Sequence, residues 1–124
     1  MIYRSELLFK LWAYSVSHNI LTLRGSNNSD LTGENYNVEI EFYGVKYIDL
    51  PVIMHGVTID ELRSNVPRKF SEHSIGGRYK VFELQNESNS YLVASSCIIG
   101  KHNWGDECDR ISNPSLVFDE IIFM

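Results

Sequence analysis

The chain has 124 residues, of which 44% are hydrophobic and 22% charged, and its formal net charge at pH 7 is −5. This length fits about one domain, and the apolar fraction is enough for one core, so we expect residues 1–124 to fold as a single domain. The acidic balance disfavours a nucleic-acid-binding protein, which needs basic groups to contact phosphates, and suits a basic protein partner instead.

The apolar residues are of the types that favour strands. The chain contains 12 Ile and 9 Val but only 2 Ala, and 15 of its residues are aromatic. β-branched and aromatic side chains fit a pleated sheet, whereas Ala is the best helix former. We therefore expect an α+β fold dominated by a single, mostly antiparallel sheet, with one short helix. A sandwich and a partly open barrel both remain compatible with this pattern.

Neither a signal peptide nor a membrane span is predicted. The first six residues carry one early basic residue, Lys10 interrupts the apolar stretch that follows, and no apolar run approaches the roughly 18 residues of a span. Cys97 and Cys108 are too few for a disulfide framework. We expect a cytoplasmic protein without a membrane partner or cofactor. Two free thiols are favoured over a Cys97–Cys108 disulfide.

The first predicted element lies at residues 7–16, where two patterns compete. Apolar residues at 7, 8, 11 and 12 fit a helical stripe, and those at 7, 9, 11 and 13 fit a strand. The β-type residues downstream favour the strand. Ser17, His18 and Asn19 favour a turn, because short polar side chains bond nearby backbone groups. A hairpin with a second strand at 20–24 is therefore predicted.

The clearest strand covers residues 36–43, after a polar linker at 25–35. Its apolar residues alternate with Glu39 and Glu41. Side chains of a strand point to opposite faces with period two, so we expect an exposed acidic face and a buried apolar face. The buried set is Val38, Ile40 and Phe42. Gly44 predicts a bend before a strand at 45–50, which Pro51 ends.

The second half is predicted to contain the helix and the remaining strands. Thr58 and Glu61 have the spacing of a capping box, so a short helix should begin at Thr58 and end before Pro67. Residues 68–74 are polar and are predicted to form a loop. Strands are expected at 79–84, 91–99 and 116–123, the first two of them paired as a hairpin.

One cluster contains the residue types of a metal or catalytic site: Cys97, His102, Asp106, Cys108 and Asp109. Thiolates, imidazoles and carboxylates bind zinc, but the Cys-x4-His-x5-Cys spacing has no paired Cys-x2-Cys knuckle. Cys97 also lies in an apolar run, where a free cysteine behaves as a small buried hydrophobe. We expect no metal and no catalytic residue here, although a Cys97–His102 pair is the alternative for an enzyme.

Acidic residues are the candidate binding groups. An acidic recognition surface and an ordinary solvated strand face both explain their distribution. The candidate binding residues are Glu34, Glu39, Glu41, Asp49, Asp106, Glu107 and Asp109.

The pattern of residues 18–62 resembles small bacterial immunity-type proteins of polymorphic or contact-dependent toxin systems. The segments that carry the resemblance are Ile20-Leu21-Thr22-Leu23, Val38-Glu39-Ile40-Glu41-Phe42, Gly44-Val45 and Thr58-Ile59. The resemblance implies a non-enzymatic protein that neutralises a toxin by binding, with acidic side chains against a basic, nuclease-like active site. The alternative from another class is a small-ligand carrier with an apolar cavity, lined by Trp12, Tyr14, Phe42 and Tyr79.

Overall fold

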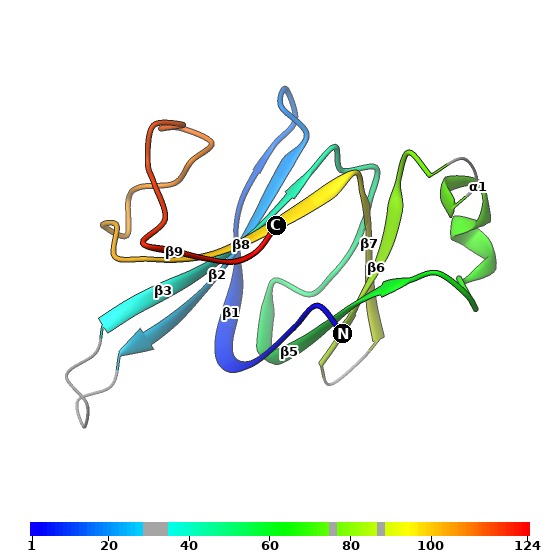
Figure 1. Ribbon diagram of the computed structural model, residues 1–124, viewed down its shortest axis with the longest axis horizontal. Helices are drawn as coiled ribbons and strands as arrows, with labels where there is room; N and C mark the ends of the chain where they lie inside the picture. The colour runs from blue at the N-terminus through cyan, green and yellow to red at the C-terminus, as the bar shows by residue number, and fades with distance from the viewer. Residues whose placement is uncertain (29–34, 75–76, 87–88) are drawn as a thin grey trace.

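The computed structural model describes residues 1–28, 35–74, 77–86 and 89–124. Within these residues the chain forms nine strands and one short helical segment (Figure 1). The strands are β1 (Tyr3–Ser15), β2 (Ile20–Asn28), β3 (Asn35–Tyr43), β4 (Tyr47–Asp49), β5 (Ile53–Leu62), β6 (Lys80–Gln85), β7 (Asn89–Ala94), β8 (Ser96–His102) and β9 (Glu120–Phe123). The helical segment consists of the 3₁₀ turn η1 (Arg68–Phe70) and α1 (Ser71–Ser74).

All nine strands belong to one antiparallel sheet in the order β4-β7-β6-β5-β1-β2-β3-β8-β9. The sheet does not close, because β4 and β9 are its two edges. β1 joins the two halves: residues 3–10 pair with β5 and residues 8–15 pair with β2. The prediction of a β-dominated fold with a single, mostly antiparallel sheet and one short helix is confirmed.

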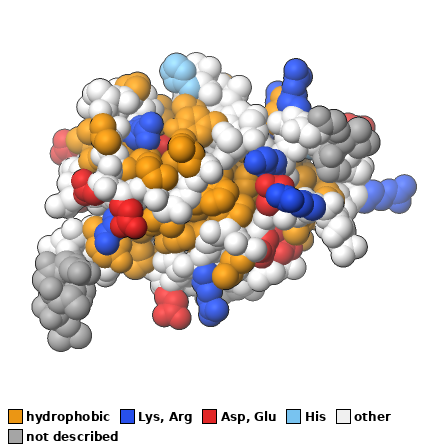
Figure 2. Space-filling view, viewed as in Figure 1, with side chains coloured by type: hydrophobic (Ala, Val, Ile, Leu, Met, Phe, Trp, Pro, Cys, Tyr) orange, Lys and Arg blue, Asp and Glu red, His pale blue; other side chains and the backbone are white. Residues whose placement is uncertain are grey.

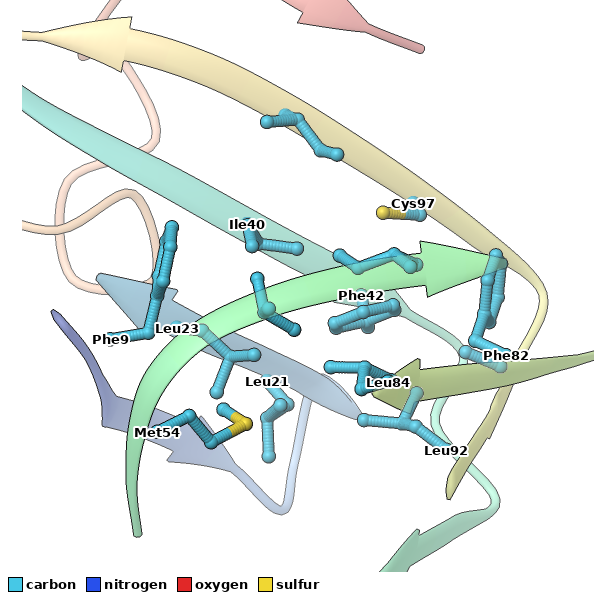
Figure 3. Close-up of a cluster of buried hydrophobic side chains, with 14 of the residues drawn as sticks. Phe9, Leu21, Leu23, Ile40, Phe42, Met54, Phe82, Leu84, Leu92 and Cys97 are labelled. Carbon is cyan, nitrogen blue, oxygen red and sulfur yellow. The ribbon is translucent and has the colours of Figure 1, made fainter. Parts of the chain in front are cut away.

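The two halves of the sheet share one apolar core (Figure 3). Leu21, Ile40 and Phe42 come from the β2–β3–β8 half, and Phe82 and Leu84 come from β6. The rings of Phe42 and Phe82 meet edge to face with their centroids 5.3 Å apart. Because side chains from both halves fill one interior, the open sheet must curve around it. The predicted burial of Val38, Ile40 and Phe42 is confirmed.

Several predicted elements are confirmed. Residues 7–16 lie largely in β1, which forms the predicted hairpin with β2. The turn between them places Asn19 at a φ of 53°, a left-handed conformation that asparagine tolerates better than most residues. β6 and β7 form the second predicted hairpin. Gly44 has a φ of 63°, which produces the predicted bend at the end of β3.

The helix predicted to begin at Thr58 is wrong. Residues 53–62 form β5, which hydrogen-bonds with β1 on one side and β6 on the other. Val57 and Ile59 are buried in the core, and two-sided pairing outweighs a capping signal formed by four local residues. The helical segment instead occupies residues 68–74, where a loop was predicted. Phe70 is fully buried there, against Val81 and Val93.

Other predicted boundaries also change. Residues 91–99 are not one strand: the chain leaves the sheet at Ser95, so that β7 pairs with β6 while β8 pairs with β3. Part of the predicted linker at 25–35 belongs to β2 and β3, and its remainder lies outside the described residues. The strands predicted at 45–50 and 116–123 shorten to β4 and β9.

The C-terminal edge strand carries apolar side chains into solvent. Ile121, Ile122 and Met124 are 49%, 40% and 82% exposed. The C-terminus lies over the middle of the face in Figure 1, where Figure 2 shows hydrophobic side chains gathered. Among the strands of the described residues, β9 pairs only with β8, so it is an edge strand of the sheet. No helix among the described residues is long and apolar enough to span a membrane.

Candidate functional site

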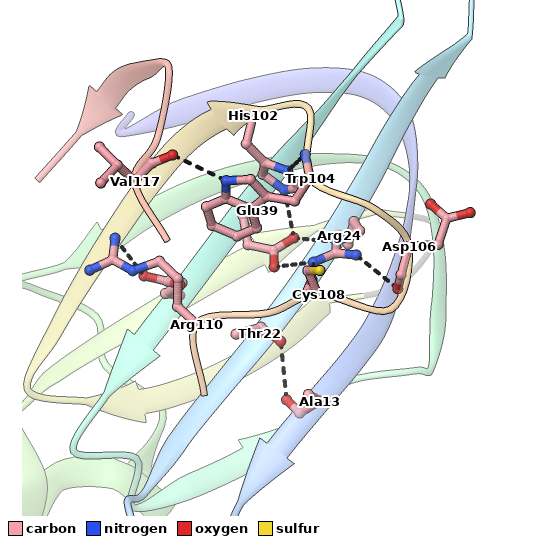
Figure 4. A network of polar contacts seen from close by, with 11 residues as sticks. Ala13, Thr22, Arg24, Glu39, His102, Trp104, Asp106, Cys108, Arg110 and Val117 are labelled. Carbon is pink, nitrogen blue, oxygen red and sulfur yellow. Dashed lines mark hydrogen bonds and ion pairs between the residues drawn. The ribbon is translucent and has the colours of Figure 1, made fainter. Parts of the chain in front are cut away.

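The acidic face of β3 is buried, so the expectation that Glu39 and Glu41 are exposed is wrong. Both residues are 0% exposed. The chain between β8 and β9, residues 103–119, crosses the outer face of β2, β3 and β8 and covers them (Figure 4). We call this stretch the covering segment. The alternation of side chains along β3 was predicted correctly, but the covering segment buries the outer face of the strand.

Glu39 is held by two basic side chains. Arg24, directly opposite on β2, donates from Nε to Glu39 Oε1 at 2.6 Å and from Nη2 to Oε2 at 2.8 Å. His102 Nε2 lies 3.3 Å from Glu39 Oε1. The side chains of Arg24, Glu39 and His102 are at most 1% exposed. A two-point guanidinium–carboxylate pair is the geometry in which buried charges compensate each other best.

Arg24 also fixes the backbone of the covering segment. Its Nη1 donates to the carbonyl oxygen of Asp106 at 3.3 Å, and its Nη2 donates to that of Cys108 at 2.5 Å. The indole of Trp12, on β1, lies over the guanidinium with 4.4 Å between Cζ and the ring centroid. One buried side chain therefore links three strands of the sheet, through Trp12 and Glu39, to the covering segment.

An aromatic stack holds both ends of the covering segment. The indole of Trp104 stacks on the ring of His102 at 3.8 Å and on that of Phe118 at 5.1 Å between centroids. Trp104 Nε1 donates to the carbonyl oxygen of Val117 at 3.1 Å. Gly100 lies beneath Phe118, and a Cβ added at Gly100 would overlap the ring atoms. The glycine thus allows Phe118 to approach the strand backbone.

A second polar cluster surrounds Glu41. The hydroxyl of Tyr43 donates to Glu41 Oε1 at 2.6 Å, and Arg110 Nη1 lies 3.6 Å from the same oxygen. Burial raises the pKa of Glu41, an effect that these two groups partly offset. Burial also raises the pKa of Tyr43. Arg110 packs its guanidinium over the ring of Phe118 at 4.9 Å, which ties this cluster to the aromatic stack.

The structure does not bring Cys97 and His102 together. They are five positions apart on β8, so their side chains point to opposite faces of the strand. Cys97 packs in the apolar core, while His102 contacts Glu39 on the outer face. The thiol–imidazole pair considered from the sequence is therefore not formed. Among the described residues, no three His, Cys, Asp or Glu side chains are grouped as metal ligands would be.

We expect the two cysteines to differ sharply in reactivity. Burial raises the pKa of Cys97 to about 12, so almost none of its thiol is ionised at pH 8. Cys108 is only partly buried, in the covering segment. A thiol reagent should therefore modify Cys108 rapidly in the folded protein, and both cysteines in denaturant. Absorbance and mass spectrometry measure the modification. Equal rates for the two cysteines in the folded state would contradict the burial of Cys97.

The remaining acidic candidates fall into two separate places. Asp49 lies on the edge strand β4, where its Oδ2 is 3.1 Å from Lys69 Nζ. Asp106 and Glu107 are exposed on the covering segment. The partly buried Asp109 accepts bonds from the backbone N–H and hydroxyl of Ser112. Glu34 lies outside the described residues. Asp106 and Glu107 are thus the exposed acidic candidates on the covering segment, and Asp49 is an exposed one on β4.

A cleft of about 530 Å³ opens between β1 and the start of the covering segment. Its floor includes Arg24, and Trp12, 37% exposed, stands at its wall. It is lined further by Leu8, Lys10, Ser26, Asn35, Tyr36, Asn37, Asn103, Trp104 and Asp106. Of these lining residues, Asp106 is a candidate predicted from the sequence, whereas Arg24 and Lys10 are not. The sequence feature that could have indicated Arg24 is that it is the single cation in the otherwise apolar predicted strand 20–24. Its partner can be identified only when the register between the strands is known.

The aromatic residues suggested for an apolar carrier cavity do not meet. Trp12 lies at the outer cleft, Phe42 is packed in the core, and Tyr79 borders the separate cluster around Phe70. Tyr14 is 42% exposed. These four side chains therefore do not line one common cavity.

The function of the site is inferred from its own geometry, because the comparisons with known proteins found no match. No family model matches the chain, and no curated protein or solved structure matches it either.

Proposed function

We propose that this chain is a non-enzymatic binding protein of the immunity type, which neutralises a basic protein partner. Its contact surface is the acidic pair Asp106 and Glu107, together with the neighbouring cleft at Trp12. The observation that supports the proposal is that buried Arg24 holds the backbone carbonyls of Asp106 and Cys108, so that exposed carboxylates stand on a fixed loop.

A fixed loop favours binding because less conformational freedom is lost when the partner docks. Trp12 adds a partly exposed aromatic side chain beside the acids, and tryptophan is among the residues that dominate binding energy at interfaces. The thiol and imidazole considered from the sequence as a catalytic pair are engaged elsewhere: Cys97 in the core and His102 with Glu39 and Trp104. The surface is thus better suited to recognition than to catalysis.

Electrostatics supports a basic partner. The chain has a formal net charge of −5, Asp106 and Glu107 are both exposed, and Asp106 lines the cleft. Complementary charge chiefly accelerates encounter between partners and loses this effect as salt screens it. Because Glu39 and Glu41 are buried, the proposed acidic contact moves from the β3 strand to the covering segment.

The identity of the partner and the place where the protein acts are proposed from the resemblance within residues 18–62. On this basis the partner is a nuclease-like bacterial toxin, encoded beside this chain, and the protein acts in the bacterial cytoplasm. Binding then occludes the toxin's basic active site and needs no catalytic residue in this chain.

The test measures association with the toxin domain encoded by the neighbouring gene. Changing Asp106→Asn and Glu107→Gln together should lower the association rate about tenfold at low salt and much less at high salt. Trp12→Ala should mainly raise the dissociation rate. The matched control is Asp49→Asn with Glu72→Gln, which removes the same charge from β4 and α1.

Two results would refute the proposal. One is absence of binding at micromolar concentration to the neighbouring gene's product. The other is an association rate that changes equally in the acidic-loop variant and in the control, because net charge alone would then explain the effect.

A further inference from the structure

The cleft between β1 and the covering segment, which we call the Trp12 cleft, is lined by several uncharged polar side chains. Asn35 and Asn37 come from β3, Ser26 comes from β2, and Asn103 follows β8. None of these four side chains makes a hydrogen bond with another described residue. Ser26 and Asn37 lie directly opposite each other in the β2–β3 ladder, so their side chains share one face of the sheet. Amide and hydroxyl groups thus converge on one opening.

Asn37 is the residue that points most clearly to a ligand. It is only 9% exposed, yet it lines the cleft. Its amide has no hydrogen-bond partner among the described residues, and its polar atoms are not among the fully buried ones. Polar groups that are largely withdrawn from water are rarely left unpaired in native proteins. Because Asn37 belongs to the lining, an occupant of the cleft contacts this amide directly.

The charges at the cleft favour a neutral ligand. Lys10 and Asp106 are both exposed and bring opposite charges to the lining. The guanidinium of Arg24 is already paired with Glu39. An anion would meet Asp106 and a cation would meet Lys10, whereas a neutral molecule avoids both repulsions. Carboxamides and hydroxyls donate and accept hydrogen bonds at once, so their natural partner is a molecule with several hydroxyl groups.

Trp12 supplies an aromatic surface beside these polar groups. Its indole lines the cleft and is 37% exposed, with the guanidinium of Arg24 packed against the ring. Trp104 also lines the cleft, but its ring is already stacked on His102 and Phe118. A sugar ring combines hydroxyl groups at its edge with an apolar face of C–H groups. The volume of about 530 Å³ is in the range of small-molecule sites and leaves room for a disaccharide.

We propose that the Trp12 cleft binds a neutral sugar, whose hydroxyl groups bond with Asn37 and its polar neighbours and whose C–H face packs on the Trp12 indole. The inference goes beyond the proposed function. It concerns a small molecule and is tested on this chain alone, so sugar binding and toxin binding can fail independently.

The test titrates four neutral disaccharides into the ¹⁵N-labelled full chain: maltose, cellobiose, lactose and chitobiose. They cover α and β linkages and both hexose and N-acetylhexosamine rings. At least one should bind saturably with a Kd of about 1 mM or tighter. It should shift the side-chain amide signals of Asn37 and Asn103 and the indole N–H signal of Trp12. Inorganic phosphate is the charged comparison probe and should not saturate these signals.

Two amide variants test the hydrogen bonds. Asn37→Leu keeps the approximate shape of the side chain and removes its amide, and Asn103→Ala truncates an exposed amide at the cleft. Each should weaken sugar binding about fivefold, the loss typical of one hydrogen bond. Asn89→Ala is the matched control, because it truncates an exposed amide on β7, away from the cleft lining. It should bind the sugar normally.

A third variant tests the stacking surface. Trp12→Ala should weaken sugar binding about tenfold, because the C–H face of the sugar loses the apolar area on which it packs. Tyr14→Ala is its control: Tyr14 is 42% exposed on the same strand and does not line the cleft. This variant should bind the sugar with unchanged affinity.

Three results would overturn the proposal. The first is that none of the four disaccharides binds with the expected affinity. The second is that phosphate saturates the cleft signals and the disaccharides do not, which would assign Lys10 and Arg24 to an anion site. The third is unchanged sugar binding in both Trp12→Ala and Asn103→Ala. If Trp12→Ala or Asn37→Leu does not fold, the comparison of Asn103→Ala with Asn89→Ala decides the question, since the Asn103 side chain has no bond to another described residue.

Discussion

Replacing Glu39 with alanine should lower the free energy of unfolding by about 3–5 kcal/mol, the range typical of removing one partner of a buried ion pair. The change leaves the guanidinium of Arg24 buried without its carboxylate, although Arg24 keeps its bonds to the carbonyls of Asp106 and Cys108. It also removes the hydrogen-bond partner of His102 Nε2. Urea denaturation followed by tryptophan fluorescence measures the loss.

Two further variants show whether the loss arises from the unpaired charge. Glu6→Ala removes an exposed carboxylate from β1 and should change stability by no more than about 0.5 kcal/mol. A double variant, Arg24→Met with Glu39→Leu, replaces both charges by apolar groups and should recover much of the loss. A loss below about 1 kcal/mol for Glu39→Ala would mean that water or another group compensates Arg24.

The importance of this network for function lies in its position between sheet and loop. Arg24 is the side chain that couples the β2–β3 pair to the backbone carrying Asp106 and Glu107. A variant that disrupts the ion pair should therefore loosen the covering segment as well as lower stability. If the acidic loop is the binding surface, the same variant also weakens binding, because the fixed geometry of the loop is lost.

The burial of Glu39 and Glu41 illustrates what alternation alone can predict. A period of two correctly separated the apolar face of β3 from its acidic face, but it carries no information on what covers the second face. The covering segment is rich in the polar and turn-forming residues of an exposed loop. Two of its contacts with the sheet are made by Trp104 and Phe118. Their partners, His102 and Gly100, can be identified only once the positions of β8 and β9 are known.

The two wrong assignments, the helix at Thr58 and the unbroken strand 91–99, have a common cause. In both places the structure is determined by pairing with strands that are distant in the sequence. The capping signal at Thr58 involves four consecutive residues, whereas β5 is fixed by pairing with β1 and β6, which lie far away in the sequence. The run 91–99 has β-type residues on both sides of Ala94, Ser95 and Ser96, and this middle stretch contains neither the glycine nor the proline that marks a break most strongly. The break at Ser95 is where the chain passes from the β6–β7 pair to the β3–β8 pair.

Replacing Phe42 with alanine should lower the free energy of unfolding by about 3–5 kcal/mol, the typical range for truncating a buried phenylalanine. The side chain is 0% exposed and meets Phe82 across the interior, so it lies where the two halves of the curved sheet contact each other. Removing the ring leaves a cavity that strands held in a hydrogen-bonded ladder can close only partly. Tyr14→Ala, which truncates a 42% exposed ring on β1, is the control and should have a much smaller effect.

Two probes in the same denaturation experiment show whether Phe42→Ala destabilises the whole core or only one half of the sheet. Trp12 and Trp104 report on the outer face of the β1–β2–β3–β8 half, and far-ultraviolet circular dichroism reports on the whole sheet. If the two halves depend on one core, both signals should change at the same, lower urea concentration in Phe42→Ala. Two separate transitions would show that the halves unfold independently, and a stability loss below about 1 kcal/mol would show that the Phe42–Phe82 contact does not hold them together.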